Sequence, residues 1–161
     1  GNLLGLTLET TAKKIAGALR YARSQALNTG ITHAAIFDTE QNRLIIAALI
    51  KPSAGGMPAA AVAAAAAVEE AVEPEPAEGR LPKQDIKTYP LPEEVRFETI
   101  AIGGELCKDS GGNDICQMVF FPDGTTQGGE IIIADTKQRT YSIDINFLTG
   151  IVSLEEQTQQ Q

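Results

Sequence analysis

The sequence has little of what catalytic and metal sites require. Its 161 residues include one histidine, two cysteines and no tryptophan, and aromatic residues make up only 5%. The histidine, His33, lies in an apolar run with no catalytic motif around it, and structural zinc usually takes four ligands. Phosphate-binding loops and dinucleotide fingerprints are also missing. We therefore expect no catalytic, cofactor-binding or metal-binding residues, and a protein that is not an enzyme.

Two weaker alternatives to this expectation involve the few polar groups that the chain does have. Asp109, Asn113 and Asp114 provide oxygen atoms of the kind that calcium favours, but their spacing does not match an EF-hand loop. A small periplasmic hydrolase would need an acid and a nucleophile to gather near His33. The simpler interpretation is a solvated loop in the first case and a packed histidine in the second.

Long apolar runs and excess positive charge are absent too. No stretch approaches the roughly 18–20 apolar residues of a membrane span. The net charge of −8 and a pI near 4.6 disfavour contact with phosphate backbones, so nucleic acid is an unlikely class of partner. Lys13, Lys14, Arg20 and Arg23 fall on one predicted helix, where a solvated surface is the expected role.

An amphipathic helix is expected over residues 8–28. Thr7 and Thr10 are candidate N-caps, and Asn28-Thr29-Gly30 is a suitable stop because Asn and Gly tolerate a left-handed backbone. The apolar positions recur at spacings of four and three, as on one side of a helix. This apolar stripe consists of Leu8, Ala12, Ile15, Leu19, Ala22 and Ala26.

The rest of the chain predicts antiparallel strands around one low-complexity insertion. Residues 31–37 and 43–50 form a hairpin pattern, and residues 94–154 are typical of a β-meander with tight turns. Between them, 51–92 is an Ala-rich, Glu- and Pro-containing insertion with an expected helix over 59–72. The fold class is therefore α+β, with the helix packed on antiparallel sheets in a single domain, 1–161.

Cys107 and Cys116 flank a loop rich in Gly, Ser, Asn and Asp. Two cysteines placed this close along a loop can satisfy disulfide geometry, and a disulfide would indicate an oxidising compartment. Two free thiols are the alternative, since a sequence does not fix the redox state.

Three motifs carry a resemblance to a known family. They are Ala22-Arg23-Ser24-Gln25-Ala26 in the helix, Phe120-Phe121-Pro122-Asp123-Gly124-Thr125 followed by Gly128-Gly129, and Leu148-Thr149-Gly150-Ile151-Val152 near the end. In their order and spacing the chain resembles the soluble heads of GspH/FimT-type minor pseudopilins, from bacterial secretion and pilus machines.

The resemblance implies a structural subunit of a type II secretion pseudopilus that acts in filament assembly and protein export. Its partners would be other pseudopilins or pilins, with the helix stripe as an assembly face. The head would lie in the periplasm, anchored in the inner membrane by an N-terminal helix that this sequence does not include. The alternative is a FimT-like minor type IV pilin involved in pilus biogenesis or DNA uptake.

Overall fold

The computed structural model of the chain describes residues 2–50, 83–108 and 115–157. These residues form one long helix and nine strands. The elements are α1 (Asn2–Thr29), β1 (His33–Asp38), β2 (Arg43–Leu49), β3 (Lys83–Pro90), β4 (Val95–Ile102), β5 (Glu105–Lys108), β6 (Ile115–Phe120), β7 (Gly129–Asp135), β8 (Thr140–Ile145) and β9 (Val152–Gln157).

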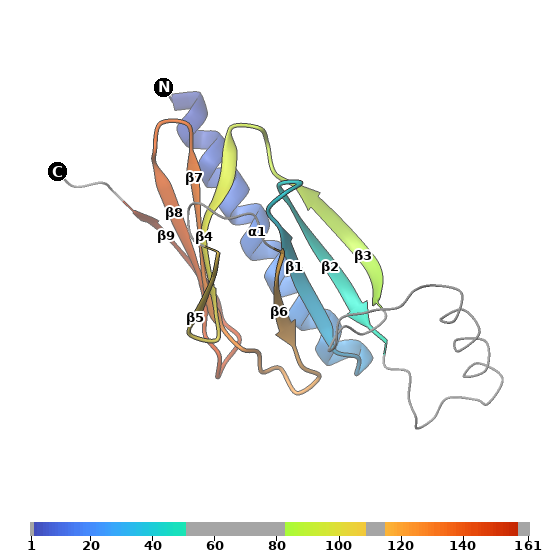
Figure 1. Cartoon of the computed structure of the whole chain (residues 1–161). Coiled ribbons are helices and arrows are strands. Elements are labelled where there is room, and N and C mark those ends of the chain that lie inside the picture. Colours follow the sequence, from blue (N-terminus) through green and yellow to red (C-terminus); the bar gives the residue numbers. More distant parts are fainter. Residues whose placement is uncertain (1, 51–82, 109–114, 158–161) are drawn as a thin grey trace.

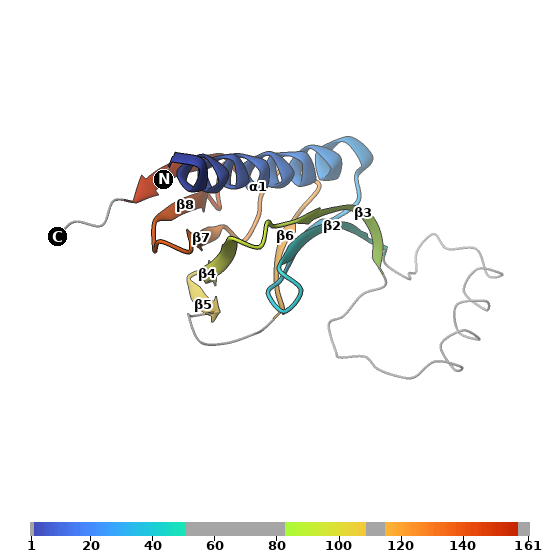
Figure 2. The same cartoon turned by 90° about the horizontal axis from the view of Figure 1, so that it is seen from above.

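The strands form two antiparallel sheets that share one helix. The first sheet has the order β3-β2-β1-β6, and the second has the order β5-β4-β7-β8-β9. Figure 1 shows α1 running along both sheets from the N-terminal end of the molecule, and Figure 2 shows it covering one side of them. The expected α+β fold, with an N-terminal helix packed on antiparallel sheets, is confirmed.

Helix α1 begins earlier than residue 8. Its first residue is Asn2, so Thr7 and Thr10 lie inside the helix and do not cap it. The hydroxyl of Thr11 donates to the carbonyl of Thr7 at 2.8 Å, which shows how a threonine satisfies its hydroxyl within a helix. The predicted stop is correct, because Gly30 follows with φ +74° and its N–H donates to the Ala26 carbonyl.

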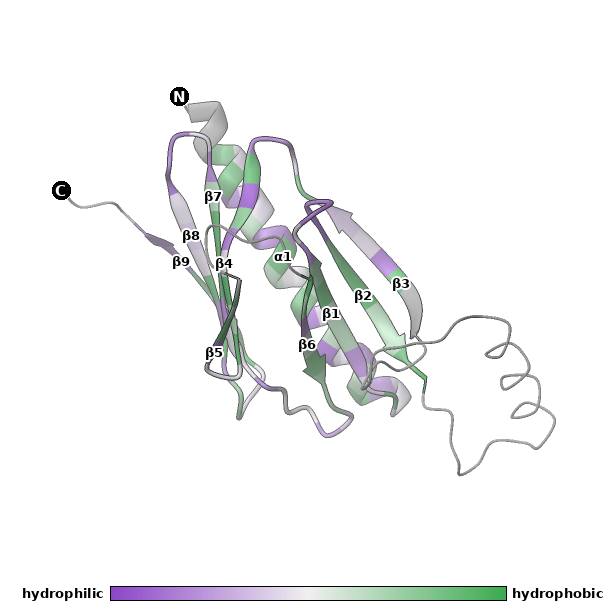
Figure 3. Cartoon of the chain, viewed as in Figure 1, coloured by the Kyte–Doolittle hydropathy of each residue, from purple (hydrophilic) through white to green (hydrophobic). Residues whose placement is uncertain are grey.

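The main core lies between α1 and the two sheets. The stripe residues of α1 pack there against Phe37, Met118, Ile131 and other fully buried side chains. Phe37 of the first sheet and Phe97 of the second make an edge-to-face contact with ring centroids 5.7 Å apart, which joins the sheets beneath the helix. Figure 3 shows apolar colour along β1, β2 and β7, while the edge strands β3 and β9 are more polar.

The expected insertion over 51–92 includes a strand that the sequence did not reveal. Lys83–Pro90 form β3, which pairs with β2 at the edge of the first sheet. An edge strand exposes much of its surface, so its residues need not be apolar. Residues 51–82, with the helix expected over 59–72, lie outside the described residues.

The segment 94–154 is not one continuous meander. After β4 and β5 in the second sheet, the chain crosses to the first sheet, where β6 pairs with β1, and then returns to the second sheet as β7. Strand β6 itself covers Ile115–Phe120. A local pattern of strands and turns does not say which neighbour a strand pairs with, and here β6 pairs with a strand far back in the sequence.

Candidate functional site

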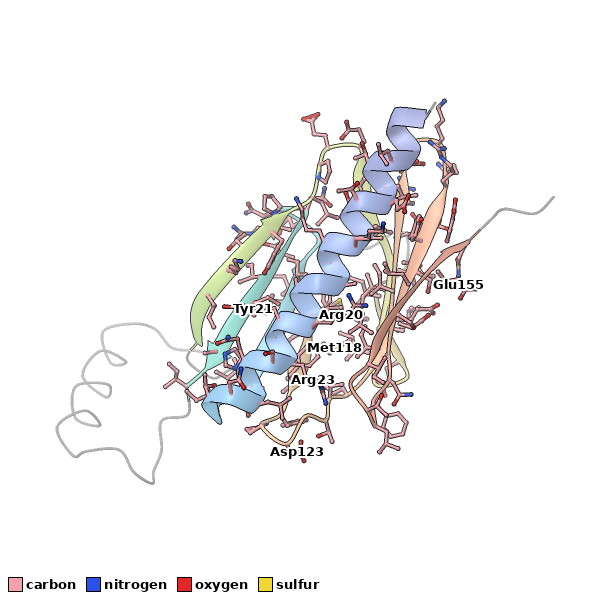
Figure 4. The ribbon with its side chains drawn as sticks, turned by 180° about the vertical axis from the view of Figure 1, so that it is seen from behind. Arg20, Tyr21, Arg23, Met118, Asp123 and Glu155 are labelled. Atoms are coloured by element: carbon pink, nitrogen blue, oxygen red, sulfur yellow. A yellow bond between two sulfur atoms is a disulfide. The ribbon has the colours of Figure 1, made fainter. Side chains whose placement is uncertain are left out.

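The three motifs of the family resemblance meet at one side chain, Arg23. Its Nε donates to the carbonyl of Gly124 at 3.0 Å. It also packs directly against the backbone of Gly150, where a Cβ would overlap Nε and lie 2.6 Å from Cδ of the same arginine. Figure 4 shows Arg23 on α1 above the turn that carries Asp123. We call this contact of Arg23, Gly124 and Gly150 the arginine junction.

The turns at the junction have their own hydrogen bonds. The N–H of Gly124 donates to the Phe121 carbonyl at 2.9 Å, and the carboxylate of Asp123 accepts from the N–H and hydroxyl of Thr125 at 3.0 and 2.7 Å. These Thr125 hydrogen bonds lower the pKa of Asp123. Gly124 and Gly150 have φ of +94° and +75°, which explains why glycine suits both positions.

Arg20 makes a second contact of the same kind. Its Nη2 donates to the carbonyl of Val152 at 2.9 Å, at the start of β9. Lys13, Lys14 and Arg20 are exposed, as expected of a solvated surface, whereas Arg23 is partly buried and departs from that expectation. The two hydrogen bonds nevertheless attach both Arg20 and Arg23 to the strands of the head. Their acceptors are backbone carbonyls more than a hundred residues away, at separations of 132 and 101.

The apolar stripe predicted as an assembly face lies inside the protein's own core. All of its residues are almost completely buried, with exposed fractions of 0–1%. These residues contact the protein's own strands, so this face of α1 attaches the helix to the two sheets. The exposed side of α1 consists of other residues, among them Lys13, Lys14, Gly17 and Ser24.

The predicted disulfide is present. Cys107 and Cys116 are bonded, with their Cα atoms 6.1 Å apart. Cys107 lies on β5 and Cys116 on β6, so the bond joins the edge of the second sheet to the edge of the first. Cys116 is buried in the main core, whereas Cys107 is partly exposed.

The connection between β8 and β9 presents a group of exposed apolar side chains that sequence reasoning did not single out. Phe147, Leu148 and Ile151 are 62%, 67% and 64% exposed. The sequence did contain a sign of this exposed apolar group, namely large apolar residues inside a tight turn, where polar residues are usual. An open hollow of about 830 Å³ adjoins this turn, and Phe147, Ile151 and Asp144 are among its lining residues.

His33 is a packed group of the first sheet. It is 1% exposed, and its Nδ1 lies 2.7 Å from the Ile31 carbonyl. Among the described residues, no three or more His, Cys, Asp or Glu side chains gather where they could hold a metal ion. The calcium candidates Asp109, Asn113 and Asp114 lie outside those residues. The described residues also include no helix with the length and hydropathy of a membrane span.

A comparison with known protein families identifies the family to which this chain belongs. The family model "Type II transport protein GspH" matches residues 11–149, a range that includes all parts of the arginine junction except Gly150. The chain belongs to the GspH family. No curated protein sequence matches it.

Two solved structures of the minor pseudopilin EpsH from the type 2 secretion system of Vibrio cholerae share this GspH-type fold. One has a TM-score of 0.57 at 11% identity, covering 92% of this chain and 96% of that one. The other has a TM-score of 0.60 at 11% identity, covering 96% and 97%. At this level of identity the likeness concerns the fold, and it confirms the GspH-type architecture expected from the motifs.

Proposed function

We propose that this chain is the head of a minor pseudopilin, a structural subunit of a bacterial type II secretion pseudopilus that acts in filament assembly and protein export. The observation that carries the proposal is the GspH family match over residues 11–149. The arginine junction supports it, because it ties the strand-rich part of the head to the single long helix at the positions of the family motifs.

The proposal places the head in the periplasm, on an apolar helix that leads upstream from α1 into the inner membrane. Two features support this placement. Helix α1 reaches one end of the molecule at its N-terminus (Figure 1), so a continuing helix would leave the head without crossing it. The disulfide between Cys107 and Cys116 suits an oxidising compartment such as the periplasm.

Contacts with other subunits must use surfaces other than the apolar stripe, because that stripe is buried inside the head. The exposed side of α1 is one such surface, and we propose that it faces neighbouring pseudopilins. Gly17 lies near its middle, and a side chain added there would meet nothing within 4 Å. This side therefore combines a small residue with the lysines Lys13 and Lys14.

The alternative role, a FimT-like minor type IV pilin in pilus biogenesis or DNA uptake, has less support in this chain. Binding to DNA requires accessible cations. Arg23 is partly buried and donates to a carbonyl of the head, so the exposed cations of α1 are Lys13, Lys14 and Arg20, in a chain of net charge −8. The β8–β9 turn presents Phe147 and Leu148 and no cation. These observations favour a protein partner over a nucleic acid.

Deletion of the gene in its native bacterium tests the proposed function. We expect export of type II secretion substrates into the medium to stop, twitching and DNA uptake to persist, and the intact gene to restore export. Normal export with loss of twitching or DNA uptake would overturn the proposal in favour of the pilus role. A gel shift that weakens with salt would point the same way.

Two substitutions at one site test the exposed side of α1. Gly17→Ala adds a methyl group to open space, and Gly17→Phe adds a bulky ring at the same place. We expect both variants to unfold at wild-type temperature or above, since glycine is a poor helix former. Export should be restored by Gly17→Ala and not by Gly17→Phe. Equal restoration by both would exclude close subunit contact at this position.

A further inference from the structure

The turn between β8 and β9 is held rigidly by its own hydrogen bonds. The side-chain oxygen of Asn146 accepts from the N–H groups of Leu148 and Thr149 at 2.8 and 2.9 Å. The hydroxyl of Thr149 accepts from the N–H of Ile151 at 3.1 Å, and Gly150 packs on Arg23. A loop that is already ordered loses little conformational entropy when it binds a partner.

This rigid turn carries three large apolar side chains into solvent. Phe147, Leu148 and Ile151 are each more than 60% exposed within five consecutive residues. Across the arginine junction, next to Gly124, the side chain of Leu27 is 43% exposed. Single exposed apolar residues are ordinary, whereas a contiguous group of them marks an interaction site.

The hollow beside the turn is acidic. Asp144 is the charged residue of its lining, which also includes Phe147, Ile151 and Ser153. Asp144 lies opposite Glu130 in the β7–β8 pair. The Ser142 hydroxyl is 2.9 Å from Glu130 and 3.4 Å from both oxygens of Asp144, so its single proton serves Glu130 better.

Asp144 therefore lacks a strong donor in this group while it is partly desolvated. Burial, followed by the negative charge of Glu130, raises its pKa, and Glu155 adds to the repulsion. A lysine or arginine from another protein would relieve this repulsion. Arg23, the cation nearest the turn, donates to the Gly124 carbonyl. The partner that complements this surface is thus apolar and basic.

We propose that the β8–β9 turn and the adjoining hollow form a docking surface for the head of another pseudopilin. The docked segment would place an apolar side chain against Phe147 and Leu148, and a lysine or arginine beside Asp144. The inference rests on the proposed function, because it takes the partner to be another subunit of the same filament.

The test measures binding between this chain and the purified heads of the other pseudopilins of the same bacterium, one at a time, by calorimetry. We expect one head to bind. The double variant Phe147→Ser, Leu148→Ser should weaken that binding at least tenfold, because truncated anchor residues typically cost this much. The matched control is Ile115→Ser, which truncates an apolar residue of 64% exposure on β6 in the other sheet and should bind as wild type does.

The charge component has its own variant. Asp144→Asn should weaken binding about three- to tenfold at low salt and flatten the dependence of affinity on salt. Circular dichroism confirms that each variant is folded before binding is compared. Equal affinity of wild type and the double variant, or an equal loss in Ile115→Ser, would overturn the proposal.

Failure of this inference is distinguishable from failure of the proposed function. If deletion of the gene stops export but none of the heads binds wild type, the docking surface is wrong and the secretion role remains. If deletion leaves export intact, the secretion role is wrong whatever the heads bind.

Discussion

Replacing Gly150 by alanine tests the arginine junction most directly. Gly150 has φ +75°, and its added Cβ would overlap Nε of Arg23 and lie 2.9 Å from the Gly124 carbonyl oxygen. Gly30 is a natural control, since it has nearly the same φ, +74°, with nothing within 4 Å of the added Cβ. The two substitutions share the backbone strain and differ in the contact with Arg23.

The expected costs follow from this difference. Alanine in the left-handed region costs roughly 1 kcal/mol, which is all that Gly30→Ala should lose. Gly150→Ala must also displace Arg23 from the Gly124 carbonyl, and a hydrogen bond from a charged donor contributes about 1.5–3 kcal/mol. We take about 2 kcal/mol for a partly exposed arginine, so Gly150→Ala should cost about 3 kcal/mol in total. For a protein of this size that lowers Tm by roughly 6–12 °C.

The assay is urea unfolding followed by circular dichroism, with a double-mutant cycle that includes Arg23→Ala. In the Arg23→Ala background, Gly150→Ala should lose little more than Gly30→Ala does, because the side chain that it displaces is gone. The close approach to the Gly124 oxygen remains and accounts for any small excess. If Gly150→Ala and Gly30→Ala cost the same in the wild-type background, the junction does not stabilise the fold as we infer.

Three further predictions concern other parts of the head. Replacing Cys107 and Cys116 by serine should cost about 2–4 kcal/mol, and reduced wild type should match the double variant in urea. Asp135 is fully buried and accepts from two turn amides and Arg139, so Asp135→Ala should cost about 2–4 kcal/mol, with a smaller loss for the exposed Asp123→Ala. Asp144→Asn should stabilise the protein at neutral pH but not below the ordinary carboxyl pKa of 3.8, as urea midpoints at pH 7 and pH 3 would show.

The sign of the last effect follows from the raised pKa of Asp144. Above that pKa the carboxylate is ionised in both states. In the folded state it is partly desolvated and repelled by Glu130, whereas in the unfolded chain it is hydrated and has no such neighbour. Below 3.8 both states are protonated and the penalty disappears. A stabilising effect of Asp144→Asn that is as large at pH 3 as at pH 7 would contradict this reasoning. For the other variants, wild-type midpoints would contradict the assigned roles.

Local patterns predicted the elements whose signals are local. The stripe from Leu8 to Ala26 has helical spacing because one side of α1 is buried, and Gly30 ends the helix through its own backbone freedom. The disulfide was predictable for the same reason, since Cys107 and Cys116 are only 9 residues apart. The turns that contain Gly124 and Gly150 were also recognisable from their composition.

The parts that depend on distant partners were not predictable. Strand β3 is polar, and it is stabilised by pairing with β2 and by Lys87, which lies over the rings of Tyr21 and Tyr89 at 5.4 and 5.7 Å. Arg23 has the same sequence context as a solvated basic residue, because its acceptor is a carbonyl that only the folded chain brings near. Neither feature leaves a periodic signal in the sequence.

Arg20 and Arg23 bind main-chain oxygen atoms, and this has a consequence for divergence within the family. Every residue type has a carbonyl, so the side chain at position 152 can change without loss of its acceptor. Both arginines constrain the path of the backbone, and Arg23 also requires a residue without a side chain at position 150. Most surface side chains of this head could therefore be exchanged without breaking either attachment of strands to helix, as long as position 150 remains glycine.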